Sequence, residues 1–432
     1  MRLGWILCLV GALVGLCVGQ PVDSRGRTLV IVDDSVDQDE WRGFFNELKA
    51  RGHNALEIRD VHDEEYELIQ YDARVYDNLI LLPTGKVRSL GPRLTSHILL
   101  DFFGKGGNIL SVTSPKAVPE SVREFSAELD IHIGPRGYKM VDHFNYEADG
   151  TTNHDSFSFG SDEVSSDASN IFTLEDPIRV SGASGAYLGN SELVIPLIHG
   201  KDTSYVYDSR DEDDVVKTPW VSGSQGHIAA ALQGNNNARF LWVGAKELLQ
   251  DKALGAELTK WVFQEKNVVR PTLFEHHLVG SEEKNERIYK VNEELTFSTG
   301  LTEWDGENWV PYHADDVQLE FVMLDPYYRL NLERVKDVDG SSVYSKTFKI
   351  PDQYGMFTFR VVYRRPGLSF VDQEDVITIR HIANDEWPRS WNITNSWVYL
   401  TSAMSVVVAW FVFTLFYLYA KDSPKDDEKK NK

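Results

Sequence analysis

The organisation of this chain depends on one uncharged stretch near its C-terminus, Trp397-Val-Tyr-Leu-Thr-Ser-Ala-Met-Ser-Val-Val-Val-Ala-Trp-Phe-Val-Phe-Thr-Leu-Phe-Tyr-Leu-Tyr-Ala420. It has about 24 residues, and an α-helix needs about 20 to cross the hydrocarbon core of a bilayer. Aromatic rings, which favour the headgroup layer, stand at both of its ends. A buried core helix would rarely be so long and so free of charge. The sequence therefore predicts a transmembrane helix over residues 397–420.

The N-terminus predicts the orientation of that helix. Met1 and Arg2 form a short positive start, an apolar run follows to Val18, and small residues precede a cleavage site after Gly19. This pattern is typical of a secretory signal peptide, residues 1–19. Lys421 follows the apolar stretch directly, in agreement with the positive-inside rule. We expect a single-pass type I membrane protein with a lumenal part from residue 20 and a cytosolic tail over residues 421–432.

The tail predicts where the protein resides. Lys429 and Lys430 stand at the fourth and third positions from the C-terminus and match the dilysine signal that returns membrane proteins to the endoplasmic reticulum. Such a signal is an address read by a receptor and not an anchor. Short lysine-rich tails after a membrane span are also common without this role. We expect the endoplasmic reticulum membrane as the location.

Composition limits the chemistry of the lumenal part. The 432 residues are 42% hydrophobic, enough for two or three domains with cores, and the formal net charge is −22. This acidity argues against nucleic-acid binding. Both cysteines, Cys8 and Cys17, lie in the expected signal peptide. A mature chain beginning at Gln20 would therefore have no disulfide, no thiolate metal site and no cysteine nucleophile.

The first lumenal segment alternates apolar strands with amphipathic helices. Strands are expected at residues 28–32, 55–58, 78–82, 108–112 and 238–243, and helices around 41–48, 98–103 and 254–263. This alternation predicts a doubly wound α/β domain with a parallel sheet. We place it at residues 20–267, with an insertion or second lobe near 135–235, where Gly, Ser and Asp are frequent.

From about residue 268 the apolar residues alternate with a period of two. Short stretches of this kind, separated by turns such as Asp339-Gly340 and Pro366-Gly367, predict a β-sandwich of immunoglobulin-like type over residues 268–383. Residues 384–396 form a juxtamembrane linker with one glycosylation acceptor, Asn392 in Asn392-Ile-Thr394. The acceptor is close to the membrane span, and whether it is glycosylated stays open.

A search for chemistry predicts no catalytic, cofactor-binding or metal site. Gly104-Lys-Gly-Gly107 follows a helix and precedes a strand, whereas a phosphate loop needs the reverse order. Asp33 ends the first strand, at the edge of the sheet where α/β folds bind ligands. The simpler interpretation is that Asp33 only begins a loop. His276-His277 is interpreted as interfacial between the domains. In the membrane helix, Thr401, Ser405 and Ala409 form a stripe of small residues, which predicts a helix-packing face, although small residues also occur in such helices without a partner.

The chain resembles the family of the forty-eight-kilodalton subunit of oligosaccharyltransferase, which includes the yeast wheat-germ-agglutinin-binding protein. No motif behind this resemblance is catalytic, and its specificity comes from the order of many motifs along the mature chain. They are Arg27-Thr-Leu-Val-Ile-Val-Asp33, Tyr76-Asp-Asn-Leu-Ile80, Leu100-Asp-Phe-Phe-Gly-Lys-Gly-Gly-Asn108, Val141-Asp-His-Phe-Asn-Tyr146, Asn236-Asn-Ala-Arg239, Trp261-Val-Phe-Gln-Glu265, His276-His-Leu-Val-Gly280, Trp309-Val-Pro-Tyr312, Asp316-Val-Gln-Leu-Glu-Phe321 and Ile350-Pro-Asp-Gln-Tyr-Gly355.

The resemblance implies a non-catalytic subunit of the membrane complex that transfers a lipid-linked oligosaccharide to asparagine in Asn-x-Ser/Thr of nascent chains. It implies an N-terminal domain similar to glutamine amidotransferases, without their cysteine nucleophile. The implied partners are a multi-span catalytic subunit, ribophorin-type subunits, a small defender-against-death-type subunit and membrane lipid. The family tail often carries a retrieval lysine pair, which Lys429 and Lys430 fit.

Two other classes of protein stay open. One is an independent lumenal carbohydrate-active enzyme, which would need a pair of carboxylates at a defined separation. The other is a type I cargo receptor, which the missing disulfides and the dilysine tail disfavour. The sequence does not tell whether this chain contacts the lipid-linked sugar or only supports the complex.

Overall fold

A computed structural model describes residues 26–33, 39–63, 65–83, 88–147, 154–210, 218–387 and 395–420. The expected signal peptide, the Asn392 acceptor and the tail lysines Lys429 and Lys430 lie outside these residues. The chain divides into two compact units, residues 1–379 and 380–432, and each is described by itself.

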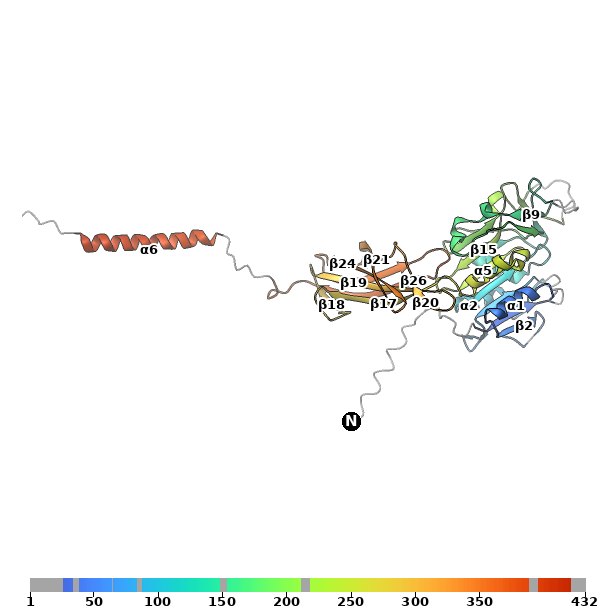
Figure 1. The fold of residues 1–432 in the computed structure, drawn as a ribbon, viewed down its shortest axis with the longest axis horizontal. Coiled ribbons are helices and arrows are strands. Elements are labelled where there is room, and N and C mark those ends of the chain that lie inside the picture. The colour runs from blue at the N-terminus through green and yellow to red at the C-terminus, as the bar shows by residue number, and fades with distance from the viewer. Residues whose placement is uncertain are drawn as a thin grey trace, which may run out of the picture. The chain divides into compact units, whose positions relative to one another are not determined.

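The first unit contains a nine-stranded sheet in which neighbouring strands follow the order β2-β1-β5-β6-β16-β15-β11-β7, and β12 also pairs with β15 (Figure 1). Its parallel strands are β2 (Leu56–Asp60), β1 (Thr28–Val32), β5 (Asn78–Leu81), β6 (Asn108–Val112) and β16 (Arg239–Val243). Every residue of the last four is buried, which explains why their sequences are apolar runs without alternation. These strands agree with the expected ones to within a few residues.

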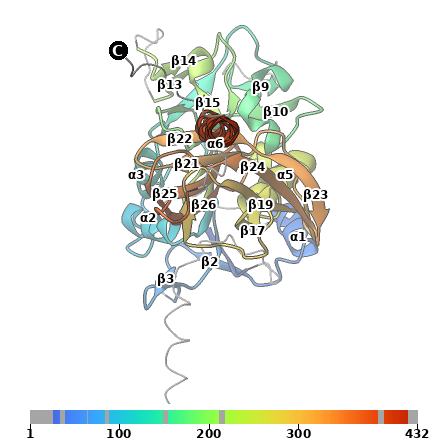
Figure 2. The same ribbon diagram turned by 90° about the vertical axis from the view of Figure 1, so that its left-hand side faces the viewer.

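Helices cover both faces of this parallel part. Phe44, Phe45 and Leu48 of α1 (Arg42–Ala50) and Leu254 and Leu258 of α5 (Lys252–Val262) pack in one apolar core with alternate residues of the strands, beside the short α4 (Glu247–Gln250). A second core on the other face contains Leu99 and Phe102 of α2 (Ser96–Gly104) and Val122 and Phe125 of α3 (Glu120–Glu128). Figure 2 shows α2 and α3 on one side of the sheet and α1 and α5 on the other.

The other part of the sheet is antiparallel, which corrects the expectation of a parallel sheet throughout. Its strands are β15 (His227–Gln233), β12 (Val194–His199), β11 (Ala186–Leu188) and β7 (Ile131–Ile133). The turn between Gln233 and Arg239 is too short for a crossover helix, so β15 and β16 must pair as a hairpin. The domain is therefore only partly of the α/β type.

The segment near 135–235 also forms smaller sheets beside the main one. A three-stranded sheet has the order β14-β13-β8, and β9 pairs with β10 in a two-stranded sheet. A separate β3-β4 hairpin lies earlier in the chain, at residues 69–74. The strands are β8 (Tyr138–Val141), β13 (Tyr205–Asp208), β14 (Val221–Ser222), β9 (Ser156–Phe159), β10 (Ile178–Ser181), β3 (Ile69–Gln70) and β4 (Ala73–Arg74).

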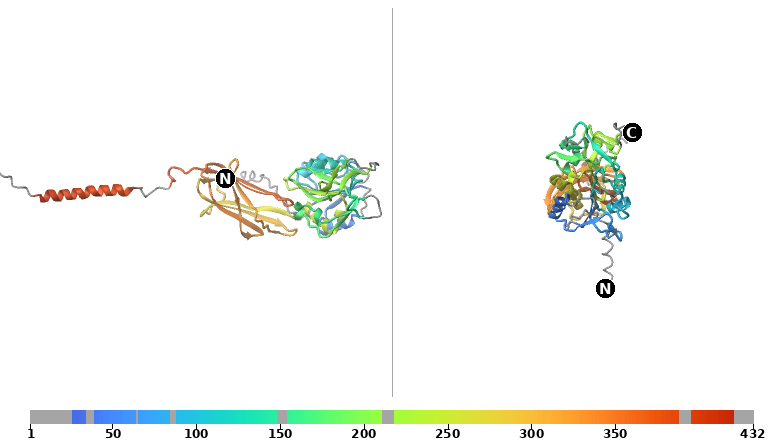
Figure 3. Two further views of the ribbon diagram at one scale, coloured as in Figure 1. Left: turned by 90° about the horizontal axis from the view of Figure 1, so that it is seen from above. Right: turned by 90° about the vertical axis from the view of Figure 1, so that its right-hand side faces the viewer.

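The rest of the first unit is a β-sandwich of two five-stranded sheets (Figure 3). One has the order β17-β19-β24-β23, with β20 on β19, and the other β18-β26-β25-β21-β22. Rings from the two sheets meet between them, as Phe297 stacks on Phe359 at 5.5 Å. The strands are β17 (Val268–Leu278), β18 (Ile288–Lys290), β19 (Glu294–Trp304), β20 (Trp309–Pro311), β21 (Gln318–Val322), β22 (Pro326–Asn331), β23 (Glu333–Val338), β24 (Ser341–Lys349), β25 (Gly355–Tyr363) and β26 (Val371–Arg380).

The second unit contains one helix, α6 (Ser396–Tyr419), of 24 residues. Its mean hydropathy is 1.9, and among the described residues it is the one helix long and apolar enough to cross a membrane. Its apolar side chains are exposed, as expected for a surface that meets lipid or another helix.

Candidate functional site

Buried polar residues begin four parallel strands and form a hydrogen-bonded row. The Asn78 side chain donates to Thr28 Oγ1 (3.4 Å), the Asn108 side chain donates to Asn78 Oδ1 (3.0 Å), and the Arg239 backbone N–H donates to Asn108 Oδ1 (3.2 Å). Each of these residues is the first of its strand. Ligands of α/β sheets bind at the opposite, carboxyl ends of strands, so this edge serves the structure of the molecule.

Arg239 ends this row with a completely buried guanidinium group. Its Nη1 donates to the carbonyls of Trp261 (2.6 Å) and Lys266 (2.8 Å), and its Nη2 donates to the carbonyl of Asn267 (2.6 Å). The group also lies over the Trp261 ring, 4.9 Å from the centroid. Removal from water lowers the pKa of Arg239 to about 9, so it is still charged at neutral pH. Carbonyls at the end of α5 take the place of a carboxylate partner.

A loop of the sandwich between β25 and β26 closes over this site. The Trp261 indole donates to the carbonyl of Gly367 (2.8 Å), and the Gln233 side chain donates to that of Leu368 (2.6 Å). Asn237 both accepts from the backbone N–H of Phe370 (2.7 Å) and donates to its carbonyl (3.1 Å). Arg239 also reaches Ser369 Oγ (3.3 Å). The Asn170 side chain donates to the carbonyl of Pro366 (2.9 Å). We call residues 366–370 the docking loop, because these five successive residues attach the sandwich to the first domain.

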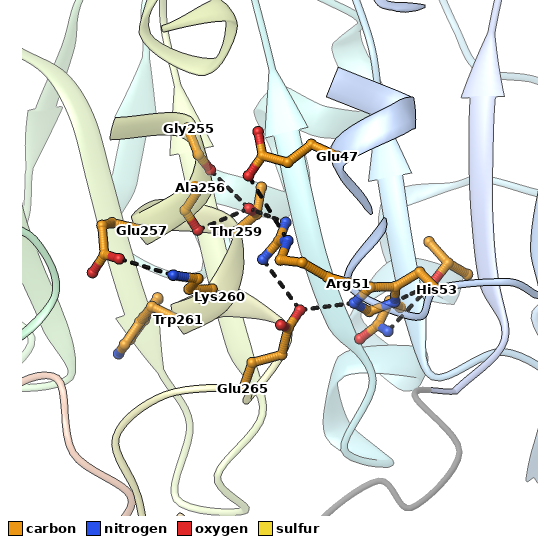
Figure 4. Close-up of polar contacts among 12 residues, drawn as sticks. Glu47, Arg51, His53, Gly255, Ala256, Glu257, Thr259, Lys260, Trp261 and Glu265 are labelled. Carbon is orange, nitrogen blue, oxygen red and sulfur yellow. Dashed lines mark hydrogen bonds and ion pairs between the residues drawn. The ribbon is translucent and has the colours of Figure 1, made fainter. Parts of the chain in front are cut away.

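A second polar cluster lies beside the row (Figure 4). Glu265 Oε1 lies 2.8 Å from His53 Nε2 and 3.3 Å from Arg51 Nη1, and Arg51 also donates to Thr259 Oγ1 (2.6 Å). His53 and Glu265 line a small pocket that also includes Trp304 of the sandwich. The centre of a water molecule can occupy only about 20 Å³ of it. One or two waters fit there, whereas ligand pockets measure about 300–1,000 Å³.

The structure describes the surroundings of the positions that the sequence offered for chemistry. Asp33 is buried at the end of β1, and the described residues contain no group of three metal-ligating side chains. Gly104-Lys-Gly-Gly107 forms the expected turn from α2 to β6, where Gly106 has φ +90°. The interfacial interpretation of His276 is wrong. Its buried ring bonds Tyr289 OH (2.7 Å) and Asp375 (3.1 Å) inside the sandwich.

The predicted helix-packing residues Thr401, Ser405 and Ala409 lie on α6, four residues apart. The Thr401 hydroxyl donates to the Val398 carbonyl (3.0 Å), and the Ser405 hydroxyl donates to the Ser402 carbonyl (2.7 Å). Both hydroxyls are therefore satisfied within the helix. Whether the stripe contacts a second helix stays a prediction.

These features define a class of protein, in which two sheet-rich domains joined by buried polar contacts are followed by one apolar helix of membrane-spanning length. Residues 21–267 match the family model of the OST48 N-terminal domain, and residues 276–421 match that of the OST48 middle domain. The chain belongs to the OST48 family.

Curated relatives cover nearly the whole chain. The dolichyl-diphosphooligosaccharide–protein glycosyltransferase subunit WBP1 of Saccharomyces cerevisiae is 35% identical and covers 91% of both chains. The corresponding wbp1 subunit of Schizosaccharomyces pombe is 33% identical over 96% of both chains. The 48 kDa subunit of the same glycosyltransferase in Caenorhabditis elegans is 27% identical and covers 98% of this chain and 99% of its own.

The sequence patterns did not predict the buried hydrogen bonds of Arg239 or those of the docking loop. The loop was recognised only as a turn, from Pro366 and Gly367. Its partners Gln233 and Asn237 are separated from it by more than 130 residues, and no local pattern indicates such a pairing.

Proposed function

We propose that this chain is a non-catalytic, structural subunit of an oligosaccharyltransferase complex that glycosylates asparagine of nascent proteins. The observation that carries the proposal is the match to WBP1 over 91% of both chains, because that relative is named as a subunit of this glycosyltransferase. The docking loop supports a structural role, since it holds two domains together through buried hydrogen bonds.

The finer parts of the proposal concern topology and partners. The chain would be a single-pass type I protein of the endoplasmic reticulum, with the domains over 20–267 and 268–383 in the lumen. Catalysis would lie on a separate multi-span subunit, and ribophorin-type and defender-against-death-type subunits would be further partners. The helices on both faces of the parallel strands fit an origin in an amidotransferase-like fold.

The membrane helix would contribute to assembly through Thr401, Ser405 and Ala409. Spacing by four residues places them on one face of α6, and small side chains let a second helix approach closely. Because both hydroxyls already bond their own helix, packing would contribute more than new hydrogen bonds.

The test is purification of the tagged full-length chain in mild detergent, with identification of co-purifying chains and an assay of oligosaccharide transfer to an Asn-x-Thr peptide. We expect stoichiometric recovery of a multi-span subunit together with transfer activity. Transfer by this chain alone would overturn the non-catalytic role. Recovery without partners would overturn the subunit role and favour a cargo receptor.

A further inference from the structure

A row of partly exposed aromatic rings runs from strand β13 to the loop that follows β8, and it shares no residue with the docking loop. Tyr207 and Tyr205 lie on β13, and their ring centroids are 5.9 Å apart. His143 follows at 5.7 Å from Tyr205, His154 at 4.8 Å from His143, and Tyr146 stacks on His154 at 3.9 Å. Phe144 lies between His143 and Tyr146 in the same loop and has 81% of its surface exposed. We call these six residues the ring row.

Hydrogen bonds connect the members of the row and fix their orientation. The two ring nitrogens of His143 bond His154 Nδ1 (2.5 Å) and Tyr205 OH (2.8 Å). The rings therefore form one surface with defined polar edges, made by residues up to 64 positions apart.

The loop that carries Phe144 and Tyr146 is held by a buried carboxylate. Asp142, 1% exposed, accepts from the backbone N–H groups of Phe144 (2.8 Å) and Asn145 (3.0 Å) and from the Thr203 hydroxyl (2.8 Å). Burial raises the pKa of Asp142, but these hydrogen bonds outweigh it and hold the pKa below its ordinary value. The loop is thus fixed in shape before any ligand arrives, which reduces the entropy lost on binding.

The cation that lies against the row is already paired. Lys139 lies over the Tyr207 ring, 5.8 Å from the centroid, and pairs with Asp155 at 3.2 Å. Asp142 points its oxygens into its own loop. An anionic ligand such as a phosphodiester chain would find no unpaired cation among these groups, so the surface favours a neutral partner.

We propose that the ring row binds a neutral oligosaccharide. Sugar rings present C–H faces that stack on aromatic rings, and Phe144 and Tyr146 expose ring surface for such stacking. The choice of a sugar over a protein partner rests on the proposed function, because the relatives are named for the transfer of an oligosaccharide. The row would hold the glycan while another subunit performs the reaction.

The test measures binding of neutral mannose-, glucose- and N-acetylglucosamine-based oligosaccharides to the full-length chain in mild detergent by saturation-transfer NMR. Phe144→Ala and Tyr146→Ala remove rings that are largely outside the core, and each is expected to weaken binding on the order of ten-fold. Phe144→Trp keeps an aromatic face and is expected to keep binding. The matched control is Tyr71→Ala, which removes a 95% exposed ring on the β3–β4 hairpin.

Several outcomes would overturn the proposal. They are no binding of any oligosaccharide to the wild-type chain, equal binding by Phe144→Ala, or equal losses in Tyr71→Ala. If Phe144→Ala binds sugar normally but loses co-purifying subunits, the row is a protein interface instead. A different result would overturn the proposed function. If the wild-type chain purifies without partner subunits, it is not a subunit, whether or not it binds sugar.

Discussion

Arg239 brings a positive charge into the interior, where protein oxygens replace its hydration shell. Three backbone carbonyls and the Ser369 hydroxyl surround the guanidinium group within 3.3 Å. These acceptors come from α5, from the segment that follows it and from the docking loop. One side chain therefore links the first residue of a central strand to the neighbouring domain.

Arg239→Lys is expected to lower the free energy of unfolding by about 2–4 kcal/mol, although it keeps the charge. A lysine ammonium cannot reach acceptors arranged around a planar fork, and some buried carbonyls would lose their donors. Urea denaturation of the full-length chain, followed by tryptophan fluorescence, measures the change. The control is Arg329→Lys, in an exposed pair with Glu320 (2.8 Å), expected to change stability by less than about 0.5 kcal/mol. Equal effects would refute the role of Arg239.

His227 makes stability depend on pH. Burial, with a smaller effect of neighbouring His199, lowers its pKa from 6.5 to about 4 in the folded chain. Below pH 6.5 the unfolded chain therefore takes up a proton that the folded chain does not. Its contribution to stability is fully present above pH 6.5 and falls as the pH drops toward 4, by up to about 3 kcal/mol.

His227→Gln is expected to remove that part of the pH dependence, whatever it does to stability at neutral pH. The measurement is the free energy of unfolding of both proteins at several pH values between 4 and 7.5. Parallel curves for the two proteins would contradict the assignment to His227.

At the scale of elements, the docking loop depends on one glycine. Gly367 has φ +79°, and a Cβ there would lie 3.0 Å from Ile171 Cγ1 and 3.1 Å from Asn170 Cβ. Gly367→Ala is expected to destabilise the loop by about 2 kcal/mol or more, through backbone strain and this contact. Hydrogen exchange of the backbone amides of residues 367–370 measures the opening. Gly280→Ala isolates the strain alone, because Gly280 has φ +88° and open space around it. A larger effect at Gly280 would refute this explanation.

The helix α6 carries a prediction about assembly. Ser405→Leu places a larger side chain on the small-residue stripe and is expected to reduce recovery of partner subunits in mild detergent. Val407→Leu makes a change off the stripe and is expected to leave recovery intact. Equal recovery of partner subunits with both variants would show that the stripe does not contribute to assembly.

Sequence patterns predicted those elements whose environment is uniform along the chain. Strands β1, β5, β6 and β16 are buried on both faces and are continuous apolar runs, and α6 has no charge, so both kinds of element were recognisable. Strands β11, β13 and β14 have two to four residues and lie among Gly and Ser. Such short segments carry no measurable period, which is why β11 and the strand that carries part of the ring row were not predicted. The longer strands β12 and β15 lie in the segment expected as an insertion, and no local pattern indicates that they pair with the main sheet.

At the scale of the molecule, the docking contacts predict that the two sheet domains unfold together. Gln233, Asn237 and Trp261 form buried hydrogen bonds to the docking loop. If this part of the first domain unfolds, these bonds break and the sandwich is no longer attached. Asn237→Ala removes both bonds to Phe370 and is expected to separate a single unfolding transition into two. Hydrogen exchange, read separately for β6 and β19, tests this. A single transition in the variant would show that other contacts suffice.

Placement of β16 also has a consequence for biosynthesis. This strand lies between β6 and β15, although the chain reaches it more than a hundred residues after β6. A ribosome adds about 5–20 residues per second, so the docking loop follows Arg239 by roughly six to twenty-five seconds. During that interval the first domain is nearly complete, but Arg239 still lacks its contact with the docking loop. We therefore expect Gln233, Asn237 and Arg239 to keep polar groups without their docking-loop partners until Phe370 has been synthesised.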